Sequence, residues 1–168
     1  MYNPTNWYWA VAGNASVVWS SASLGYVPTT DATYTAWLAA GNSPTSIASA
    51  AELYQVMQQQ VVPAIQTAGV QITSTSTPSL NGPYPIDEGS QSDMSAIAAG
   101  IAAGKGLPSG GSPFAYPNLE GAEVVFTAEQ FTAFAAAIEA YLYAFNQALA
   151  ASIGGGTTAM PSTALTIA

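Results

Sequence analysis

Lys105 is the one basic side chain of the sequence, and it stands among glycines that could form an anion-binding loop. The order Gly100, Gly104, Lys105 resembles a phosphate-binding loop, but that loop needs four residues between its glycines and a serine or threonine after the lysine. Here three residues separate the glycines, and a glycine follows the lysine. We therefore interpret Lys105 as a cation at a helix C-terminus, where it complements the helix dipole. A Ser-Lys dyad with Ser109 or Ser112 is the weaker alternative, because flexible glycine neighbours position a catalytic pair poorly.

Acidic residues are the second group that could do chemistry. Asp87, Glu88 and Asp93 form the densest cluster, but their spacing lacks the alternating oxygen ligands and central glycine of a calcium loop. We interpret them as charge at a helix N-terminus, which the helix dipole favours. A carboxylate pair for glycoside hydrolysis could come from this cluster or from Glu120 and Glu123, and it needs two carboxyl groups about 5 Å or about 6.5 to 9.5 Å apart. The sequence has no histidine and no cysteine, so we predict no metal site, no cofactor and no catalytic residue.

Aromatic residues concentrated near the N-terminus are the third group. Trp7, Trp9, Trp19 and Tyr26 could stack on sugar rings or anchor a protein partner if they lie on the solvent-facing side of a strand. Packing in the core of a small sheet is the more common role for such side chains. The sequence leaves both alternatives open, and these four residues are the predicted contacts to a partner or a glycan.

The surface of this protein must be polar and nearly uncharged. Charged residues make up 6% of the chain, against about 25% in an ordinary globular domain. The net charge of −8 repels phosphate-rich partners, so we expect no nucleic-acid binding. No apolar run reaches the roughly 18 to 20 residues of a membrane-spanning helix, so we expect no membrane insertion. An uncharged surface suits burial against other subunits, where unpaired charges are costly, and this favours a homo-oligomer.

Residues 1–69 are predicted to form a β-meander followed by two helices. An aromatic and β-branched stretch divided by a Gly-Asn turn favours short antiparallel strands. Residues 28–31 provide capping chemistry for the first helix, and Ser49 with Glu52 has the capping-box spacing at the start of the second. Pro63 should end or kink that second helix, because proline removes a backbone donor.

The rest of the chain is predicted to hold a connector, a second unit and a tail. Residues 70–86 are rich in serine, threonine and proline and are expected to be a connector with some extended character. Residues 87–153 are expected to contain a helix, a β-hairpin and a long amphipathic helix that begins with a capping box at Thr127. Residues 154–168 have no helical period and are expected to dock as an extended arm. The predicted fold class is α+β, with two small units that each pack a short antiparallel hairpin or meander against helices.

Several sequence strings together resemble a known family. In the first half they are Trp7 to Gly13, Val18 to Ser21, Tyr26 to Pro28, Tyr34 to Asn42 and Ile47 to Leu53, and in the second half Leu80 to Gly82, Gly104 to Pro108 and Phe126 to Phe131, with Tyr141. The first set resembles an N-terminal module of small phage and prophage proteins encoded around tail-fibre genes. The second set resembles the uncharacterised domain that accompanies this module, so the resemblance covers nearly the whole chain.

The resemblance implies a role in a virus particle and transfers no catalytic motif. We expect a non-enzymatic structural component of a tailed bacteriophage virion, associated with the tail or tail fibre. It would be made in the host bacterial cytoplasm and would work through contacts with other phage structural proteins. Two alternatives stay open. One is a tail-fibre assembly chaperone, and the other is a host-attachment module that binds a receptor or glycan through the N-terminal aromatic residues.

Overall fold

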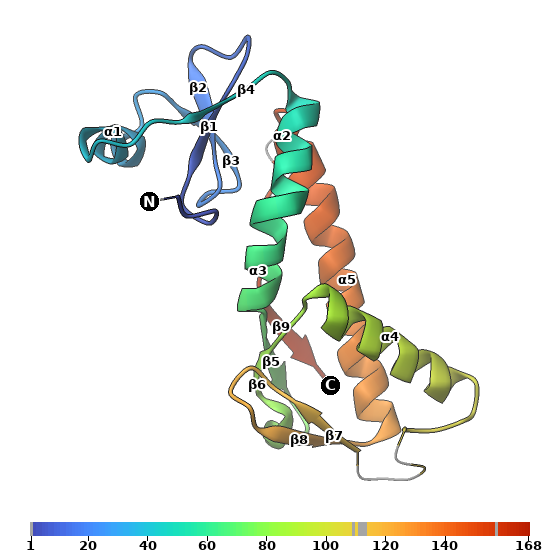
Figure 1. Cartoon of the computed structure of the whole chain (residues 1–168). Helices are drawn as coiled ribbons and strands as arrows, with labels where there is room; N and C mark the ends of the chain where they lie inside the picture. The colour runs from blue at the N-terminus through green and yellow to red at the C-terminus, as the bar shows by residue number, and fades with distance from the viewer. Residues whose placement is uncertain (1, 109, 111–113, 157) are drawn as a thin grey trace. The chain divides into compact units, whose positions relative to one another are not determined.

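The computed structural model describes residues 2–108, 110, 114–156 and 158–168 (Figure 1). With 44% helix and 22% strand in mixed sheets, it confirms the α+β fold class. The chain divides into two compact units, and each is assembled from two separate stretches. The first unit is Met1–Ile65 with Ala144–Met160, and the second is Gln66–Tyr143 with Pro161–Ala168. The predicted end of the first unit at residue 69 is close to its first break, but the division within the long helix was not predicted.

The first unit contains a four-stranded sheet with the order β3-β2-β1-β4. Three of its strands are the expected antiparallel meander: β1 (Tyr8–Val11), β2 (Val17–Ser20) and β3 (Gly25–Pro28). The fourth strand, β4 (Thr45–Ile47), lies parallel to β1 and was not predicted. Trp9 lies opposite Thr45, and Val11 lies opposite Ile47. A parallel neighbour needs a long connection, and here the chain runs through β2, β3 and helix α1 (Ala32–Ala39) between β1 and β4.

The helix caps predicted for the first unit are present. One carboxylate oxygen of Asp31, Oδ1, accepts hydrogen bonds from the backbone N–H groups of Thr33 and Tyr34, both at 2.9 Å. Ser49 Oγ accepts from the N–H of Glu52 at 3.2 Å and begins helix α2 (Ala50–Val56). The Glu52 carboxylate reaches one residue further back than in an ordinary capping box, to the N–H of Ala48 at 2.7 Å.

Pro63 does not end the second helix. The chain continues from α2 through a π-helical turn, η1 (Met57–Val61), into α3 (Val62–Ala68). A proline inside an α-helix clashes with the carbonyl one turn earlier, and a π turn at that point widens the backbone. The strain of the proline is therefore absorbed by a local change of helix type.

Both faces of the first unit's sheet are covered. On one face, Tyr8 and Val18 form a buried cluster with Tyr34 of α1, and Trp37 packs against it. On the other face, α2 contacts β1 and β4, and the end of helix α5 (Ala128–Ile153) hydrogen-bonds to the β2–β3 region. Figure 1 shows α1 on one side of β1 and α2 on the other.

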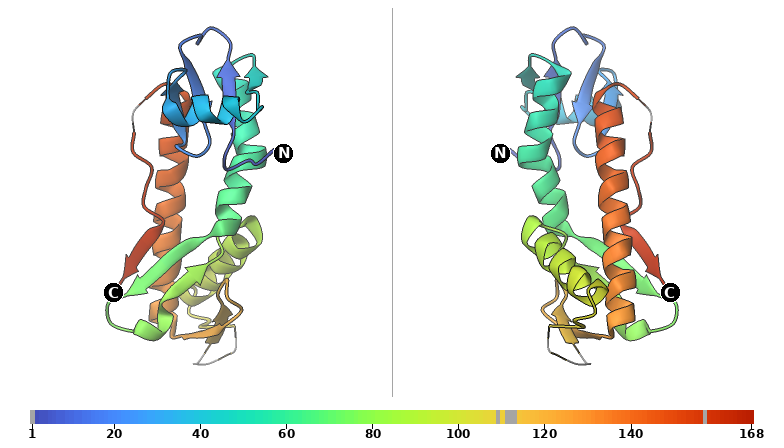
Figure 2. Two further views of the ribbon diagram at one scale, coloured as in Figure 1. Left: turned by 90° about the vertical axis from the view of Figure 1, so that its left-hand side faces the viewer. Right: turned by 90° about the vertical axis from the view of Figure 1, so that its right-hand side faces the viewer.

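The predicted connector, residues 70–86, is part of the core of the second unit. It forms β5 (Val70–Ser74), a short 3-10 helix η2 (Pro78–Leu80) and β6 (Gly82–Tyr84). Strand β9 (Ala164–Ile167), the docked form of the expected C-terminal arm, lies parallel to β5 and gives the strand order β6-β5-β9. Both views of Figure 2 show β9 beside β5. Ile72, Leu80 and Tyr84 are all 0% exposed, so this segment is structural and not a linker.

The rest of the second unit follows the sequence closely. Helix α4 (Glu88–Ala102) begins at its predicted cap, Asp87, and β7 (Phe114–Pro117) forms a hairpin with β8 (Glu123–Phe126). A complete capping box begins α5, because Gln130 N–H donates to Thr127 Oγ1 and Thr127 N–H donates to Gln130 Oε1. The amphipathic stripe of α5 is the centre of this core, where Phe134 lies 4.8 Å from Tyr84 and 5.1 Å from Phe126 between ring centroids.

Candidate functional site

Two of the four predicted contact residues are core residues. Trp9 and Trp19 are 1% and 0% exposed, and their rings meet at a centroid distance of 5.9 Å. They lie directly opposite each other on β1 and β2, so both point to the sheet face that α2 covers. The expectation that Trp9 contacts a glycan or a partner is therefore wrong, and so is the same expectation for Trp19.

The other two predicted residues are half-buried and hydrogen-bonded within the first unit. Trp7 Nε1 donates to Thr45 Oγ1 at 2.9 Å, and the Trp7 ring packs edge-on against Trp37. The Tyr26 hydroxyl donates to the backbone carbonyl of Ile153 at 3.4 Å. Partial burial raises the pKa of Tyr26, because desolvation disfavours the charged phenolate. These contacts fix β3 and β4 in the unit.

The acidic candidates do not form a catalytic or metal site. Asp87 caps α4 by accepting from Ser90, and these hydrogen bonds lower the pKa of its carboxyl group. Glu120 and Glu123 are exposed on the β7–β8 hairpin. Among the residues that the structure describes, no group of three acidic, cysteine or histidine side chains could hold a metal ion.

Lys105 belongs to the end of α4. Its backbone N–H donates to the Gly100 carbonyl at 3.0 Å, which closes the last turn of the helix. This agrees with the interpretation of the glycines as a helix terminus and not as a phosphate loop. Ser109 and Ser112, the candidate partners of a Ser-Lys dyad, lie outside the described residues.

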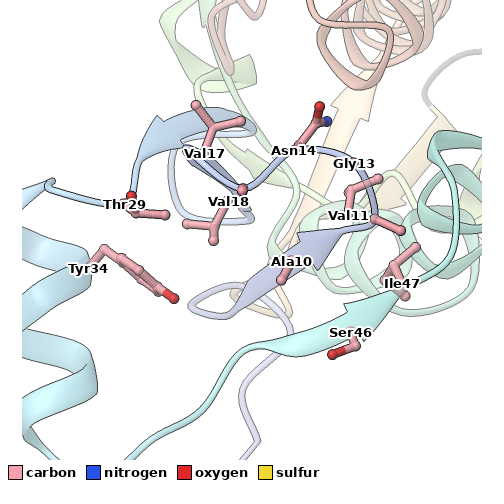
Figure 3. A pocket seen from close by; sticks show the side chains of 12 residues that line it. Ala10, Val11, Gly13, Asn14, Val17, Val18, Thr29, Tyr34, Ser46 and Ile47 are labelled. Atoms are coloured by element: carbon pink, nitrogen blue, oxygen red, sulfur yellow. The ribbon is translucent and has the colours of Figure 1, made fainter.

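A groove in the first unit is the most developed candidate site. It has a volume of about 480 Å³ and lies at the end of the β1–β2 hairpin, beside α1 and β4 (Figure 3). Its walls are mainly small apolar side chains: Ala10, Val11, Ala12, Ala15, Val17, Val18 and Ile47. Asn14, Thr29, Tyr34 and Ser46 are its polar side chains, and none of the lining residues carries a charge.

Tyr34 gives the groove its most distinctive polar atom. The residue is 5% exposed, and its ring is held by Tyr8 at 4.8 Å and by Trp37 at 6.1 Å between centroids. Figure 3 shows the Tyr34 side chain reaching from α1 toward Ala10, with its hydroxyl directed into the groove. This hydroxyl has no hydrogen-bond partner within the described part of the chain. The hydroxyl is not one of the buried polar atoms that lack a partner, so it faces the solvent of the groove and is available to a ligand.

Strand β4 provides a second set of available polar groups at the rim of the groove. The Ile47 carbonyl accepts from the N–H of Ala12 at 2.8 Å, so Ile47 points its backbone groups toward β1. Because backbone groups alternate along a strand, those of Ser46 point away from β1. No other strand of the described residues pairs with this edge, and Ser46 is exposed.

The arrangement suits recognition of an uncharged group. An anion would find no cation in the lining, and a cation would find no carboxylate. Sequence reasoning missed both Tyr34 and Ser46 as site residues, because the groove depends on the parallel β4 strand. Two features of the sequence could have indicated the groove. Asp31 caps a helix and so places Tyr34 in its first turn, and small residues surround the Gly13 turn.

None of the helices in the described part of the chain combines the length and the apolar character that a membrane-spanning helix needs. Comparison of the chain with family models, with curated proteins and with solved structures gave no match.

Proposed function

We propose that this protein is a non-enzymatic structural component of a tailed bacteriophage particle, associated with its tail or tail fibre and made in the host cytoplasm. The resemblance of its sequence strings to proteins of tail-fibre loci supports the phage context. The composition supports a role based on contacts, since one lysine and nine acidic residues leave few groups for catalysis. Its partners in this proposal are other phage structural proteins and further copies of the chain.

The main structural support for this proposal is that most strands at the sheet edges are uncharged. Within the described residues, six strands lie at sheet or hairpin edges: β3, β4, β6, β7, β8 and β9. Among these strands only β8 has a charged residue, Glu123. Soluble proteins commonly protect such edges with charge or proline, because unpaired edges template association. Proline is present on β3, β6 and β7, but β4 and β9 have neither proline nor charge.

An exposed apolar face on the β7–β8 hairpin points in the same direction. Val125 is 50% exposed, Leu119 in the connecting turn is 41% exposed, and Ala115 lies opposite Val125 in the register. Exposed apolar side chains on a hairpin face are suited to burial against a partner. The alternative of a glycan-binding module is weakened, because Trp9 and Trp19 are buried and cannot stack on a sugar.

Quantitative mass spectrometry of gradient-purified particles tests the proposal. We expect a fixed ratio of this chain to the major tail protein across the particle peak. Its absence from particles, together with its presence in the infected-cell lysate, would favour the chaperone alternative and refute a permanent role.

A pair of variants separates specific contacts from trapping of the chain in the particle. Val125→Glu places a charge on the exposed hairpin face, whereas Ala140→Glu places the same charge on the exposed side of α5. If the hairpin face is a contact, the Val125 variant is depleted from particles and the Ala140 variant is retained. Equal incorporation of both would remove this face from the proposal.

A further inference from the structure

We propose that the groove and the adjoining edge of β4 bind an extended, uncharged peptide segment of another protein, which adds to β4 as a strand and places an apolar side chain beside Tyr34. This deepens the proposed role by naming the chemistry of one contact. It does not require that the partner belongs to a phage, because it rests on the groove alone.

The backbone of Ser46 provides the first part of the argument. Its N–H and C=O point away from β1 and have no partner within the described part of the chain. One donor and one acceptor on the same residue match the paired hydrogen bonds that an added strand makes. Neither Ser46 nor its neighbours from Ser43 to Ile47 are charged, and the strand contains no proline.

The groove provides the second part of the argument, because it accepts the side chains of such a strand. The Ser46 side chain lines the groove, so a strand paired with β4 lies along its rim. The small alanine and valine side chains leave about 480 Å³ of space beside the edge. In strand addition, backbone hydrogen bonds give affinity, and pockets beside the edge select alternate side chains.

Tyr34 adds polar selectivity to an otherwise apolar wall. The residue is only 5% exposed, and its hydroxyl is directed into the groove. This hydroxyl has no hydrogen-bond acceptor among the described residues. A carbonyl oxygen of a peptide supplies such an acceptor without introducing charge. Because the donor is already held in place by Tyr8 and Trp37, little side-chain entropy is lost when it is used.

The surroundings favour a peptide over a sugar and over a second copy. A sugar carries hydroxyl groups all around its ring, and most of them would face apolar alanine and valine walls without hydrogen bonds. The two buried tryptophans provide no stacking surface for it. A second copy would bring another net charge of −8, and a single added strand offers far less contact area to offset this repulsion than the larger interfaces between copies in a particle, so the groove favours a partner that is neutral or basic overall.

Titration of the ¹⁵N-labelled full chain, followed by two-dimensional NMR, tests the proposal. The probe is the uncharged peptide acetyl-Val-Thr-Val-Thr-Val-amide, and the comparison peptide is acetyl-Glu-Thr-Glu-Thr-Glu-amide. We expect the uncharged peptide to shift the amide signals of Gly13, Ser46 and Ile47 and to saturate. The charged peptide should leave these signals unchanged. The N-acetylglucosamine trimer is the third probe, and saturable shifts of the same amides by this sugar but not by the peptide would overturn the peptide assignment.

Three variants assign the contacts. Tyr34→Phe should raise the peptide Kd roughly 2- to 12-fold, which corresponds to one neutral hydrogen bond. Tyr143→Phe, which removes a hydroxyl from a residue that is 70% exposed in the second unit, should leave the Kd unchanged. Ser46→Pro removes the outward N–H without removing a ladder bond to β1, and it should abolish binding while the circular dichroism spectrum is retained.

Several results would overturn this proposal. They are no shift of the Ser46 amide at the highest soluble peptide concentration, equal binding of the two peptides, or equal affinity of the wild-type chain and Tyr34→Phe. The particle measurements above are independent of all of these, since they report where the protein is found and not what the groove binds. Failure of one proposal can therefore be told apart from failure of the other.

Discussion

Gly69 allows a sharp test of the backbone in the second unit. It follows the last residue of α3 and has a φ of +76°, in the left-handed region. A Cβ atom added at Gly69 would lie 2.3 Å from the Tyr84 carbonyl oxygen and 2.7 Å from Leu119 Cδ1. Gly121, in the β7–β8 turn of the same unit, also has a φ of +76°, but a Cβ there meets nothing within 4 Å.

The two alanine variants therefore share one energetic cost and differ in another. The left-handed conformation costs a residue with a Cβ about 1–2 kcal/mol, and this applies to Gly69→Ala and Gly121→Ala alike. The carbonyl contact at Gly69 adds an overpacking cost of about 1–3 kcal/mol, because Tyr84 belongs to a strand paired with β5 and cannot move freely. We expect Gly69→Ala to lower the free energy of unfolding by about 2–5 kcal/mol and Gly121→Ala by about 1–2 kcal/mol.

Urea unfolding followed by far-ultraviolet circular dichroism measures this difference. Tryptophan fluorescence serves as an internal control, because Trp7, Trp9, Trp19 and Trp37 all belong to the first unit. The circular dichroism midpoint of the Gly69 variant should fall well below that of the Gly121 variant. Equal midpoints for the two variants would show that the close approach of Gly69 to β6 is not present in solution, and the reasoning would fail.

Three further predictions concern the second unit. Phe134→Ala, which empties the centre of the aromatic core where this side chain is 0% exposed, should cost about 3–5 kcal/mol in urea unfolding, whereas truncation of the exposed Tyr143 to alanine should cost less than about 1 kcal/mol. Asp87→Ala should lower the free energy of unfolding by about 1 kcal/mol, because the α4 cap is lost. The pKa of Asp87 is lowered in the folded chain, so its contribution to stability is complete above the unfolded pKa of about 3.9 and is lost as the pH falls through the folded pKa. The free energy of unfolding, measured against pH in the acid range, should therefore change less in the variant than in the wild-type chain. Burial raises the pKa of Tyr84 to about 12. Between about pH 10 and that value the unfolded chain therefore binds fewer protons than the folded one, so stability should fall as the pH rises. Tyr84→Phe should make this slope shallower in alkaline unfolding experiments, and part of the slope should remain because burial also raises the pKa of Tyr2, Tyr26, Tyr116 and Tyr141.

Elements specified by neighbouring residues were predictable from the sequence. The caps at Asp31, Asp87 and Thr127 each satisfy free backbone donors within three residues, so the local pattern suffices. The meander, the hairpin of β7 and β8, and the amphipathic stripe of α5 follow for the same reason, since their partners are adjacent in the chain or on one helix face. Hydrogen bonds and burial of side chains at short range decide these elements.

Elements that depend on distant partners were not predictable. Strand β5 pairs with β9, and Ile72 lies opposite Leu165 across more than half of the sequence. Nothing within residues 70–86 indicates that partner, so a segment rich in serine, threonine and proline was interpreted as a connector. The groove was missed for the same reason, because it combines the hydroxyl of Tyr34 with the edge of a strand whose parallel pairing with β1 is non-local.

The end of α5 shows why the two units cannot be separated by cutting the chain once. Leu24, in the turn between β2 and β3, has a φ of +51°, which costs a residue other than glycine about 1–2 kcal/mol. Ser152, which is 3% exposed, donates from its Oγ to the Leu24 carbonyl at 2.6 Å, and Tyr26 in β3 donates to the carbonyl of Ile153. These bonds offset the strain of the turn, and they come from residues more than 120 positions further along the chain. The N-terminal meander that supports the groove therefore depends on the C-terminal end of the long helix, and any ligand bound in the groove should stabilise both stretches of the first unit together.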